Sequence, residues 1–346
     1  MPEDTPNGSL KLGIVGLGYI GSVVGEQFAR HPDAEIVAVC DLNDERLATI
    51  GERFGVDPAR RYLEDDRLFA EAPIDAVLIG TPHTLHHDQV RAALDRDLHV
   101  YCDKPLTTDL EDARDLTHRA REASTTVMVG YQRHLQTAFK TARERYRPTD
   151  DQGREPTWLT ASITQPWIAD SAGTWRLDPV HSGGGFLYDT GSHVLDAVLW
   201  TTGLVPESVR ASMDFHDDQG RVDSRAHLDV TFEGGATGTI SLNGDAVAVR
   251  EHIHCWDDEG AVYLEGKQWR SRKVFEVDTE SGEYHPYIDH QREQTRAGAF
   301  LEAVREGNTP QATPEDALAV TALTEAAYES ARRGERVTVE GLEAGR

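Results

Sequence analysis

The chain opens with short apolar runs that alternate with amphipathic segments. Leu12–Val15 is apolar and rich in branched residues, which predicts a buried strand. Ile20, Val24 and Phe28 then share one face of a predicted helix, and Glu35–Cys40 reads as a second buried strand. Helical patterns and apolar runs alternate in this way up to residue 130, which predicts a doubly wound parallel sheet with helices on both faces. The later apolar runs of this half are Ile74–Gly80, Leu98–Cys102 and Thr126–Gly130.

After residue 130 the pattern changes to β-like runs separated by turn signals, followed by two helical segments. This order predicts a second α+β domain with an open mixed, mostly antiparallel sheet. We place a disordered tip at residues 1–9, a dinucleotide-binding domain at 10–130 and a domain for substrate binding and oligomerisation at 131–346. The β-like runs are Trp158–Thr164, Ser208–Asp214, Ala226–Phe232, Ala236–Leu242, Val249–Trp256, Val262–Leu264 and Arg272–Val277, and the helical segments are Gln291–Arg305 and Glu315–Arg333.

A glycine-rich turn joins the first strand to the first helix with the spacing G-x-G-x-x-G. Gly16 permits a tight turn, Gly18 lets the backbone approach a pyrophosphate, and Gly21 allows close packing of helix on strand. The helix N-terminus offers N–H groups and a positive dipole end to phosphates. In this strand–turn–helix–strand context the motif predicts a Rossmann dinucleotide site. Its cofactor-binding residues are Gly16, Gly18, Tyr19, Ile20, Gly21 and Asp41.

Asp41 ends the second strand, 20 residues after Gly21. A carboxylate at this position accepts hydrogen bonds from the adenosine ribose and repels a 2′-phosphate, which favours NAD over NADP. Leu42 and Asn43 bring no cation, and the nearest arginine along the chain is Arg46.

The charge balance excludes some partners. Sixty acidic residues against 35 lysines and arginines give a net charge of −25, which argues against nucleic acids and anionic membranes. The chain has only five lysines, and this composition is typical of proteins from salt-loving cytoplasms; an ordinary acidic enzyme is the alternative. The polar, acidic N-terminus and three widely spaced cysteines favour a reducing cytoplasm. The adjacent His86 and His87 lack acids or cysteines at ligand spacing, so we expect no metal.

Two further clusters could carry chemistry. Asp103-Lys104-Pro105 follows a strand at the carboxyl edge of the predicted parallel sheet, where ligands bind. Lys104 could stabilise negative charge on a reacting oxygen, although alone it could equally be a surface lysine. Asp189 and His193 are four residues apart behind a glycine-rich segment, so a helix would place them on one face. Helix capping by Asp189 and a solvated His193 are the alternative for that pair.

These motifs together resemble the glucose–fructose oxidoreductase / inositol dehydrogenase / MocA-type family over nearly the whole chain. The resemblance implies a Rossmann domain followed by an α/β domain, and hydride transfer between NAD(P) and a sugar, polyol or related alcohol. It implies Lys104, Asp189 and His193 as catalytic residues. It also adds Thr81, Pro82, His86, Asp103 and Lys104 to the cofactor site, and gives Lys104, Arg133, Trp175, Arg176, Asp189 and His193 as substrate-binding residues.

Two positions depart from the family pattern. Asp103 stands where the family usually has glutamate, so its reach toward the nicotinamide ribose is shorter. His83 stands where asparagine is common after Thr-Pro, which changes the contacts on the nicotinamide side.

We therefore expect an NAD(P)-dependent oxidoreductase acting on CH–OH groups of a sugar or polyol, with NAD preferred. A glycoside-cleaving enzyme with tightly held NAD and a non-catalytic cofactor sensor are the alternatives on the same scaffold. The open sheet predicted for the second half cannot be covered by its own helices alone, so we expect a homodimer or homotetramer built through that face.

Overall fold

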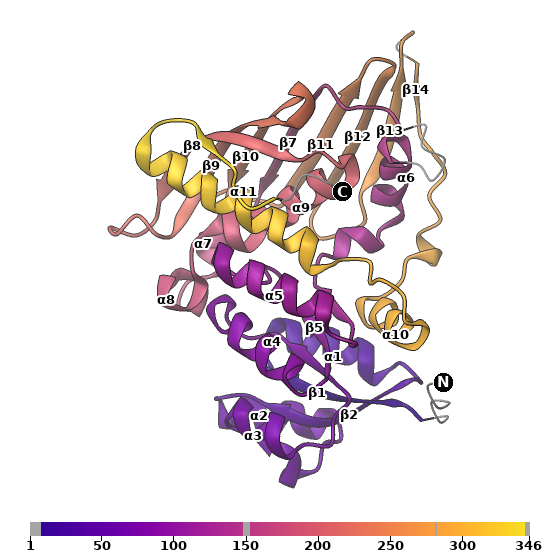
Figure 1. The fold of residues 1–346 in the computed structure, drawn as a ribbon, viewed down its shortest axis with the longest axis vertical. Helices are drawn as coiled ribbons and strands as arrows, with labels where there is room; N and C mark the ends of the chain where they lie inside the picture. Colours follow the sequence, from indigo (N-terminus) through magenta and orange to yellow (C-terminus); the bar gives the residue numbers. More distant parts are fainter. Residues whose placement is uncertain (1–7, 148–152, 281, 343–346) are drawn as a thin grey trace. The chain divides into compact units, whose positions relative to one another are not determined.

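The computed structural model describes residues 8–147, 153–280 and 282–342, which form two compact units (Figure 1). The first unit contains the chain up to residue 106 together with 115–130 and 294–314, and the second contains 107–114, 131–293 and 315 onward. The units are therefore discontinuous in sequence, whereas the sequence pattern predicted a single boundary at residue 130. Most of the expected N-terminal tip, residues 1–7, lies outside the described residues.

The first unit contains a six-stranded sheet in the order β3-β2-β1-β4-β5-β6, in which all paired strands are parallel. This is the doubly wound order of a Rossmann fold, and it confirms the predicted architecture. The strands are β1 (Leu10–Val15), β2 (Ala34–Cys40), β3 (Arg61–Tyr62), β4 (Ala76–Ile79), β5 (His99–Cys102) and β6 (Val127–Val129). The helices are α1 (Tyr19–Ala29), α2 (Asp44–Arg53), η1 (Pro58–Arg60), α3 (Asp65–Glu71), η2 (His83–Leu85), α4 (His86–Leu94), α5 (Leu110–Glu122) and α10 (Arg296–Glu306).

Helix α10 returns to the first unit from late in the sequence and packs against α1. The ring of Phe300 meets the rings of Phe28 and Tyr101 edge-on, with centroids 5.8 and 6.1 Å away. The helix begins at Arg296 because the Thr295 hydroxyl accepts a hydrogen bond from the Gly298 N–H. It is therefore shorter at its N-terminus than the helix expected over 291–305.

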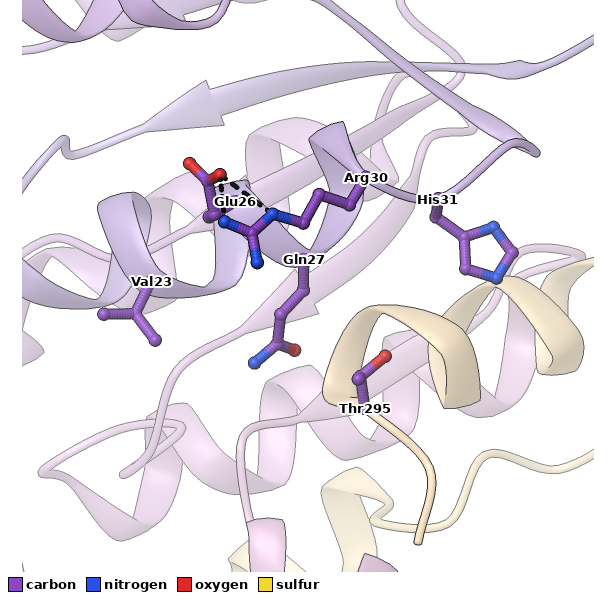
Figure 2. A pocket seen from close by; sticks show the side chains of 6 residues that line it. All are labelled: Val23, Glu26, Gln27, Arg30, His31 and Thr295. Atoms are coloured by element: carbon purple, nitrogen blue, oxygen red, sulfur yellow. Dashed lines mark hydrogen bonds and ion pairs between the residues drawn. The ribbon is translucent and has the colours of Figure 1, made fainter. Parts of the chain in front are cut away.

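A hollow of 420 Å³ lies beside this junction, between Thr295 and the C-terminal half of α1 (Figure 2). Gln27 points from α1 toward Thr295, and its side-chain oxygen accepts a hydrogen bond from the Ala297 N–H. Glu26 and Arg30 pair along α1. The hollow adjoins the negative dipole end of α1, opposite to the end that favours phosphate, so we assign it to helix packing.

The second unit contains a nine-stranded sheet in the order β14-β13-β12-β11-β7-β10-β9-β8-β15. Only the β7–β10 pair is parallel among the paired strands, which confirms a mixed, mostly antiparallel sheet. The strands are β7 (Trp158–Thr164), β8 (Pro206–Phe215), β9 (Asp223–Phe232), β10 (Thr237–Asn243), β11 (Arg250–Asp257), β12 (Gly260–Lys267), β13 (Lys273–Asp278), β14 (Glu283–Tyr284) and β15 (Val337–Thr338).

Helices cover one face of this sheet, where α6, α9 and α11 lie together in Figure 1. Burial alternates along the central strands: Leu159, Ala161 and Ile163 of β7 are buried, while the residues between them are partly exposed. The unit's helices are η3 (Gln132–Leu135), α6 (Thr137–Tyr146), α7 (Trp167–Asp170), η4 (Trp175–Leu177), α8 (Pro179–Ser182), η5 (Leu187–Gly191), α9 (Ser192–Thr202), η6 (Glu233–Gly235), η7 (His290–Arg292) and α11 (Pro314–Arg333). Among the described residues, no helix has the length and apolar character needed to cross a membrane.

Candidate active site

The glycine turn of the first unit has the shape that a dinucleotide needs. Gly16 has φ +87°, and a side chain on Gly21 would put its Cβ 1.9 Å from the Gly16 carbonyl oxygen. A Cβ on Gly18 would meet nothing within 4 Å, so space is open above that residue. Helix α1 makes its first backbone hydrogen bond at the Ser22 N–H, which leaves the N–H groups of Tyr19, Ile20 and Gly21 at the helix start. The turn therefore fits a bound pyrophosphate.

Asp41 lies at the end of β2 and is fixed by its surroundings. One carboxylate oxygen accepts a hydrogen bond from the Leu17 N–H and the other from the Asn43 N–H, both at 2.8 Å. Contrary to the expectation that no cation stands nearby, the Arg46 guanidinium is 3.2 Å from the Asp41 carboxylate. Asn43 caps α2 by accepting from the Arg46 N–H, and the first turn of the helix brings Arg46 back beside Asp41.

The loop after β4 carries Thr81, Pro82 and His83, and His86 ties it to the loop after β5. His86 is fully buried, with one ring nitrogen 3.0 Å from the Thr81 carbonyl oxygen and the other 2.8 Å from the Pro105 carbonyl oxygen. Burial lowers the pKa of His86, which favours a neutral ring that donates to one of the two carbonyls. His86 was expected to bind the cofactor. In the structure its two contacts hold the loop after β4 and the loop after β5 together.

Asp103 and Lys104 follow β5 and are largely buried. The Asp103 N–H donates to the Ile79 carbonyl at 2.9 Å, which continues the pairing of β4 and β5 beyond the strands. Gly130 lies against this segment, because a Cβ there would come within 2.7 Å of an Asp103 carboxylate oxygen. The Lys104–Pro105 peptide bond is cis. Thr81, Asp103 and Lys104 therefore all leave the carboxyl ends of neighbouring parallel strands, the edge where such folds bind ligands.

In the second unit, Asp189 lies in a π-helical turn, η5, that leads directly into α9 and His193. From the sequence, one regular helix was expected through both residues. The wider π-turn changes the angle between them, and such turns often occur at functional sites. Both side chains are buried, with 6 % of Asp189 and 8 % of His193 exposed.

The buried carboxylate of Asp223 anchors the glycine-rich segment that precedes this turn. It accepts hydrogen bonds from the Leu187 N–H, at 2.9 Å, and from the Tyr328 hydroxyl. The Tyr328 hydroxyl in turn accepts from the Gly185 N–H at 2.9 Å. Gly185 must be glycine here, because a Cβ would lie 2.2 Å from the Asp223 backbone nitrogen. Burial raises the pKa of Asp223 to about 6, and these hydrogen bonds oppose the rise.

One carboxylate oxygen of Asp189 receives two side-chain N–H groups. The Trp167 indole nitrogen donates at 2.6 Å and the Arg176 Nε donates at 2.9 Å. The Arg176 guanidinium also lies over the Trp175 ring, 4.5 Å from its centroid. Arg176 therefore contacts both Asp189 and Trp175, the other two residues expected at this side of the substrate site.

Aromatic rings that the sequence did not single out surround His193. Its ring centroid is 5.9 Å from that of Trp269 and 6.5 Å from that of Tyr131. Trp167, which donates to Asp189, was also missed. None of these residues belongs to a recognisable motif, so only the folded chain reveals them.

Arg133, expected in the substrate pocket, forms part of a buried ion cluster. Its guanidinium makes two hydrogen bonds to the Glu251 carboxylate, at 2.7 and 2.5 Å, and Arg272 pairs with the same carboxylate. Burial alone would raise the pKa of Glu251, but the two arginines hold it below its ordinary value. Arg133 also lies near Trp269 of the site, whose ring centroid is 5.9 Å from its guanidinium carbon. The described part of the chain has no cluster of three or more histidine, cysteine, aspartate or glutamate residues that could hold a metal ion.

Family models match both halves of the chain. Residues 10–131 match an oxidoreductase family with an NAD-binding Rossmann fold, and residues 151–263 match the GFO/IDH/MocA C-terminal domain. The chain belongs to the GFO/IDH/MocA oxidoreductase family. It is therefore an oxidoreductase with a Rossmann domain for a nicotinamide dinucleotide, as its glycine turn indicated.

Individual proteins also match this chain over almost its full length. D-xylose 1-dehydrogenase (NADP(+)) 2 of Haloferax volcanii is 26% identical, over 95% of this chain and 98% of the relative. Myo-inositol 2-dehydrogenase of Thermotoga maritima is 24% identical, over 96% of this chain and 99% of the relative. The solved structure of levoglucosan dehydrogenase with NADH and levoglucosan has 19% identity and a TM-score of 0.82, over 96% of this chain and all of the other, and shares its fold.

Proposed function

We propose that the protein is an NAD(P)-dependent enzyme that oxidises a hydroxyl group of a sugar or polyol, or reduces the corresponding carbonyl group. The observation that carries the proposal is Asp189, held by Trp167 and Arg176 directly before His193 in a GFO/IDH/MocA chain. Two relatives similar over the full length are named as dehydrogenases of xylose and myo-inositol, a sugar and a polyol. A neutral polyhydroxylated substrate also suits a site of carboxylate, imidazole and indole groups.

The chemistry divides among three side chains. A bound nicotinamide cofactor supplies the hydride acceptor or donor. His193 takes the proton of the reacting hydroxyl, because imidazole accepts and returns protons near neutral pH. Lys104, at the carboxyl edge of the parallel sheet, stabilises negative charge that develops on a reacting oxygen. Asp189 accepts a hydrogen bond from the substrate, with its orientation fixed by Trp167 and Arg176.

The remaining expected residues support this chemistry. Trp175 and Arg176 form the side of the substrate site next to Asp189. Arg133 acts through Trp269, whose ring faces both Arg133 and His193. Thr81, Pro82 and Asp103 contact the cofactor, while His86 sets the loops that carry them.

Replacing His193 tests the proton-transfer role. With the best substrate from a screen of pentoses, hexoses and inositols, His193→Ala should lower kcat about 10²-fold or more and remove the pH dependence near neutrality. NAD affinity should stay close to that of the wild type, because His193 belongs to the second unit and not to the glycine turn.

The matched control is His118→Ala, because His118 is an exposed histidine on α5 whose ring pairs with the equally exposed Glu122. Its kcat should equal that of the wild type. Unchanged kcat and pH profile in His193→Ala would assign the proton transfer to another residue. A combined His193→Ala and Lys104→Ala variant should lose much less than the product of the single effects if the two groups act together.

We propose that NAD is preferred over NADP, since Asp41 stands at the ribose position and is held there by two backbone N–H groups. Once the Asp41 carboxylate is removed, the Arg46 guanidinium beside it can bind the 2′-phosphate of NADP, so a substitution of Asp41 can reverse the cofactor preference. Asp41→Ser should lower the ratio of kcat/KM for NAD to that for NADP by about 10- to 100-fold, the effect of one or two charge-assisted hydrogen bonds.

Adding Arg46→Gln to Asp41→Ser should remove any gain with NADP, because the guanidinium is then lost as a partner for the 2′-phosphate. Arg53→Gln is the matched control: this half-exposed arginine lies on the same helix, paired with Glu26. A wild-type enzyme with higher kcat/KM for NADP than for NAD would contradict the preference.

We infer that the protein is a homodimer or homotetramer formed through the open face of the second sheet. An aromatic cluster on that face supports this assembly: the rings of Trp158 and Trp256 are 4.4 Å apart, and Tyr263 lies 5.5 Å from Trp256. Trp158 is 44 % exposed in the single chain. Exposed aromatic clusters on a flat sheet are typical of protein interfaces.

Trp158→Glu should therefore shift the mass measured by light scattering toward that of the monomer, since a charge would be buried at the interface. Tyr287→Glu is the control, because Tyr287 is 90 % exposed in a loop outside the sheet. A monomeric wild type at assay concentration would rule out the assembly.

We propose further that the protein works in a salt-rich cytoplasm, on the basis of its net charge of −25. The melting temperature should rise steadily from low salt to about 2 M KCl, because screening relieves repulsion between surface carboxylates. A flat or falling curve would contradict salt adaptation and leave the alternative of an ordinary acidic enzyme.

A further inference from the structure

A second hollow lies within the second unit, next to Gly183 of the glycine-rich segment. It has a volume of 810 Å³, within the range of ligand pockets. Helix α11, the turn between β8 and β9, the end of the chain around β15 and residues Gly183 and Tyr188 form its walls. Asp189 and His193 do not line it, so it is separate from the residues assigned to hydride transfer.

Small and aromatic side chains form the floor of the hollow. Ala322 and Ala326, one turn apart on α11, leave the space that longer side chains would fill. The rings of Tyr188 and Tyr328 stack with centroids 5.3 Å apart. Tyr328 is fixed by its hydrogen bonds to Asp223 and Gly185, so the floor is rigid. Tyr188 is 5 % exposed, and its hydroxyl has no hydrogen-bond partner among the described residues, which leaves it available to a ligand.

Four arginines line the rim, namely Arg221, Arg332, Arg333 and Arg336. Arg333 pairs with Glu329 at 2.5 Å. The other three have no carboxylate within 4.0 Å of their guanidinium groups in the described part of the chain. Among the described residues, Arg336 donates to neutral oxygens, including the Asp229 carbonyl and the Thr231 hydroxyl at 3.2 Å, which orient its charge without cancelling it.

Stabilisation of the α11 dipole explains only part of this cluster. Arg332 and Arg333 lie in the last turn of α11, where cations are favourable. Arg221 comes from the turn after β8, and Arg336 from the segment before β15. Convergence of three segments on one hollow, in a chain with 60 acids and 35 bases, indicates a site for an anion.

Glutamates that line the hollow beside the arginines indicate which kind of anionic ligand it can bind. Glu325 accepts a hydrogen bond from the Leu110 N–H at 2.8 Å, and burial raises its pKa. Together with Glu340, which also lines the hollow, it offers acceptors for hydroxyl groups beside the arginines. A bare anion would gain nothing from these carboxylates, whereas a ligand with both a phosphate and hydroxyl groups uses both sets of partners.

We propose that this hollow binds a phosphorylated sugar or polyol. The phosphate meets Arg221, Arg332 and Arg336, and the ring or carbon chain lies over Tyr188 and Tyr328. Hydroxyl groups donate to Glu325 and pair with the Tyr188 hydroxyl. The protein thus carries a second ligand site on the unit that holds Asp189 and His193, with chemistry distinct from the redox site.

Calorimetry on the full-length protein tests the site with glucose 6-phosphate, inorganic phosphate and glucose as probes, at the lowest KCl concentration that keeps the protein folded. Glucose 6-phosphate should bind saturably and more tightly than either of the other probes. Arg332→Gln and Arg221→Gln should each weaken its binding about tenfold or more, as expected for loss of a charge-assisted contact.

The matched control is Arg225→Gln, an exposed arginine on β9 that pairs with Asp214 and Asp245 outside the hollow and should bind like the wild type. Binding should also persist in His193→Ala, which separates this site from the proposed catalytic one. Absence of saturable binding, equal binding of inorganic phosphate, or equal loss in Arg225→Gln would each overturn the proposal.

Discussion

The carboxylate of Asp223 is the contact on which the second unit's chemistry depends. It is fully buried at the start of β9, and it links the glycine-rich segment, through the Leu187 N–H, to α11, through the Tyr328 hydroxyl. A buried carboxylate is costly unless hydrogen bonds compensate it, and these donors supply that compensation. The same group therefore fixes the start of the π-turn that carries Asp189 and holds Tyr328 in the wall of the second hollow, so the turn and the hollow share one anchor.

Buried positive charges elsewhere in the molecule are compensated in the same way, by partners that pair with them directly. The surface is rich in acids, but several arginines lie inside, each against a carboxylate. Arg133 and Arg272 share Glu251, and Arg145 pairs with Asp257 at 2.6 Å with both side chains largely buried. Salt screens exposed charges far more than buried pairs. High salt can thus relieve repulsion on the surface while the internal pairs that position Arg133 and its neighbours stay intact.

The sequence predicted those features that depend on neighbouring residues. The parallel sheet followed from continuous apolar runs, and the glycine turn from three spaced glycines, because each signal lies within one short segment. The strand β3 and helix α3 were missed, since a two-residue strand and a seven-residue helix are too short to show a clear period.

Features set by distant residues could not be predicted in this way. The π-turn at Asp189 depends on Asp223, which lies 36 residues after Leu187. The family resemblance placed Arg133 at the substrate pocket, but its ion pair with Glu251 could not be predicted, because Glu251 lies 118 residues further along the chain. Arg46 was discounted by its separation in sequence, although the first turn of α2 returns it to Asp41.

The contacts between Asp41 and Arg46 indicate that a small difference in binding free energy separates NAD from NADP. A carboxylate offers about four lone-pair sites, and the Leu17 and Asn43 N–H groups and Arg46 use three of them. The backbone contacts hold Asp41 rigidly, but the Arg46 contact joins a half-exposed side chain, and such pairs contribute about 1 kcal/mol or less. A ribose hydroxyl can therefore replace Arg46 at little cost, whereas a 2′-phosphate would have to draw the guanidinium away from a carboxylate that does not move. The proposed preference for NAD therefore rests on the rigidity of Asp41 more than on an absence of positive charge.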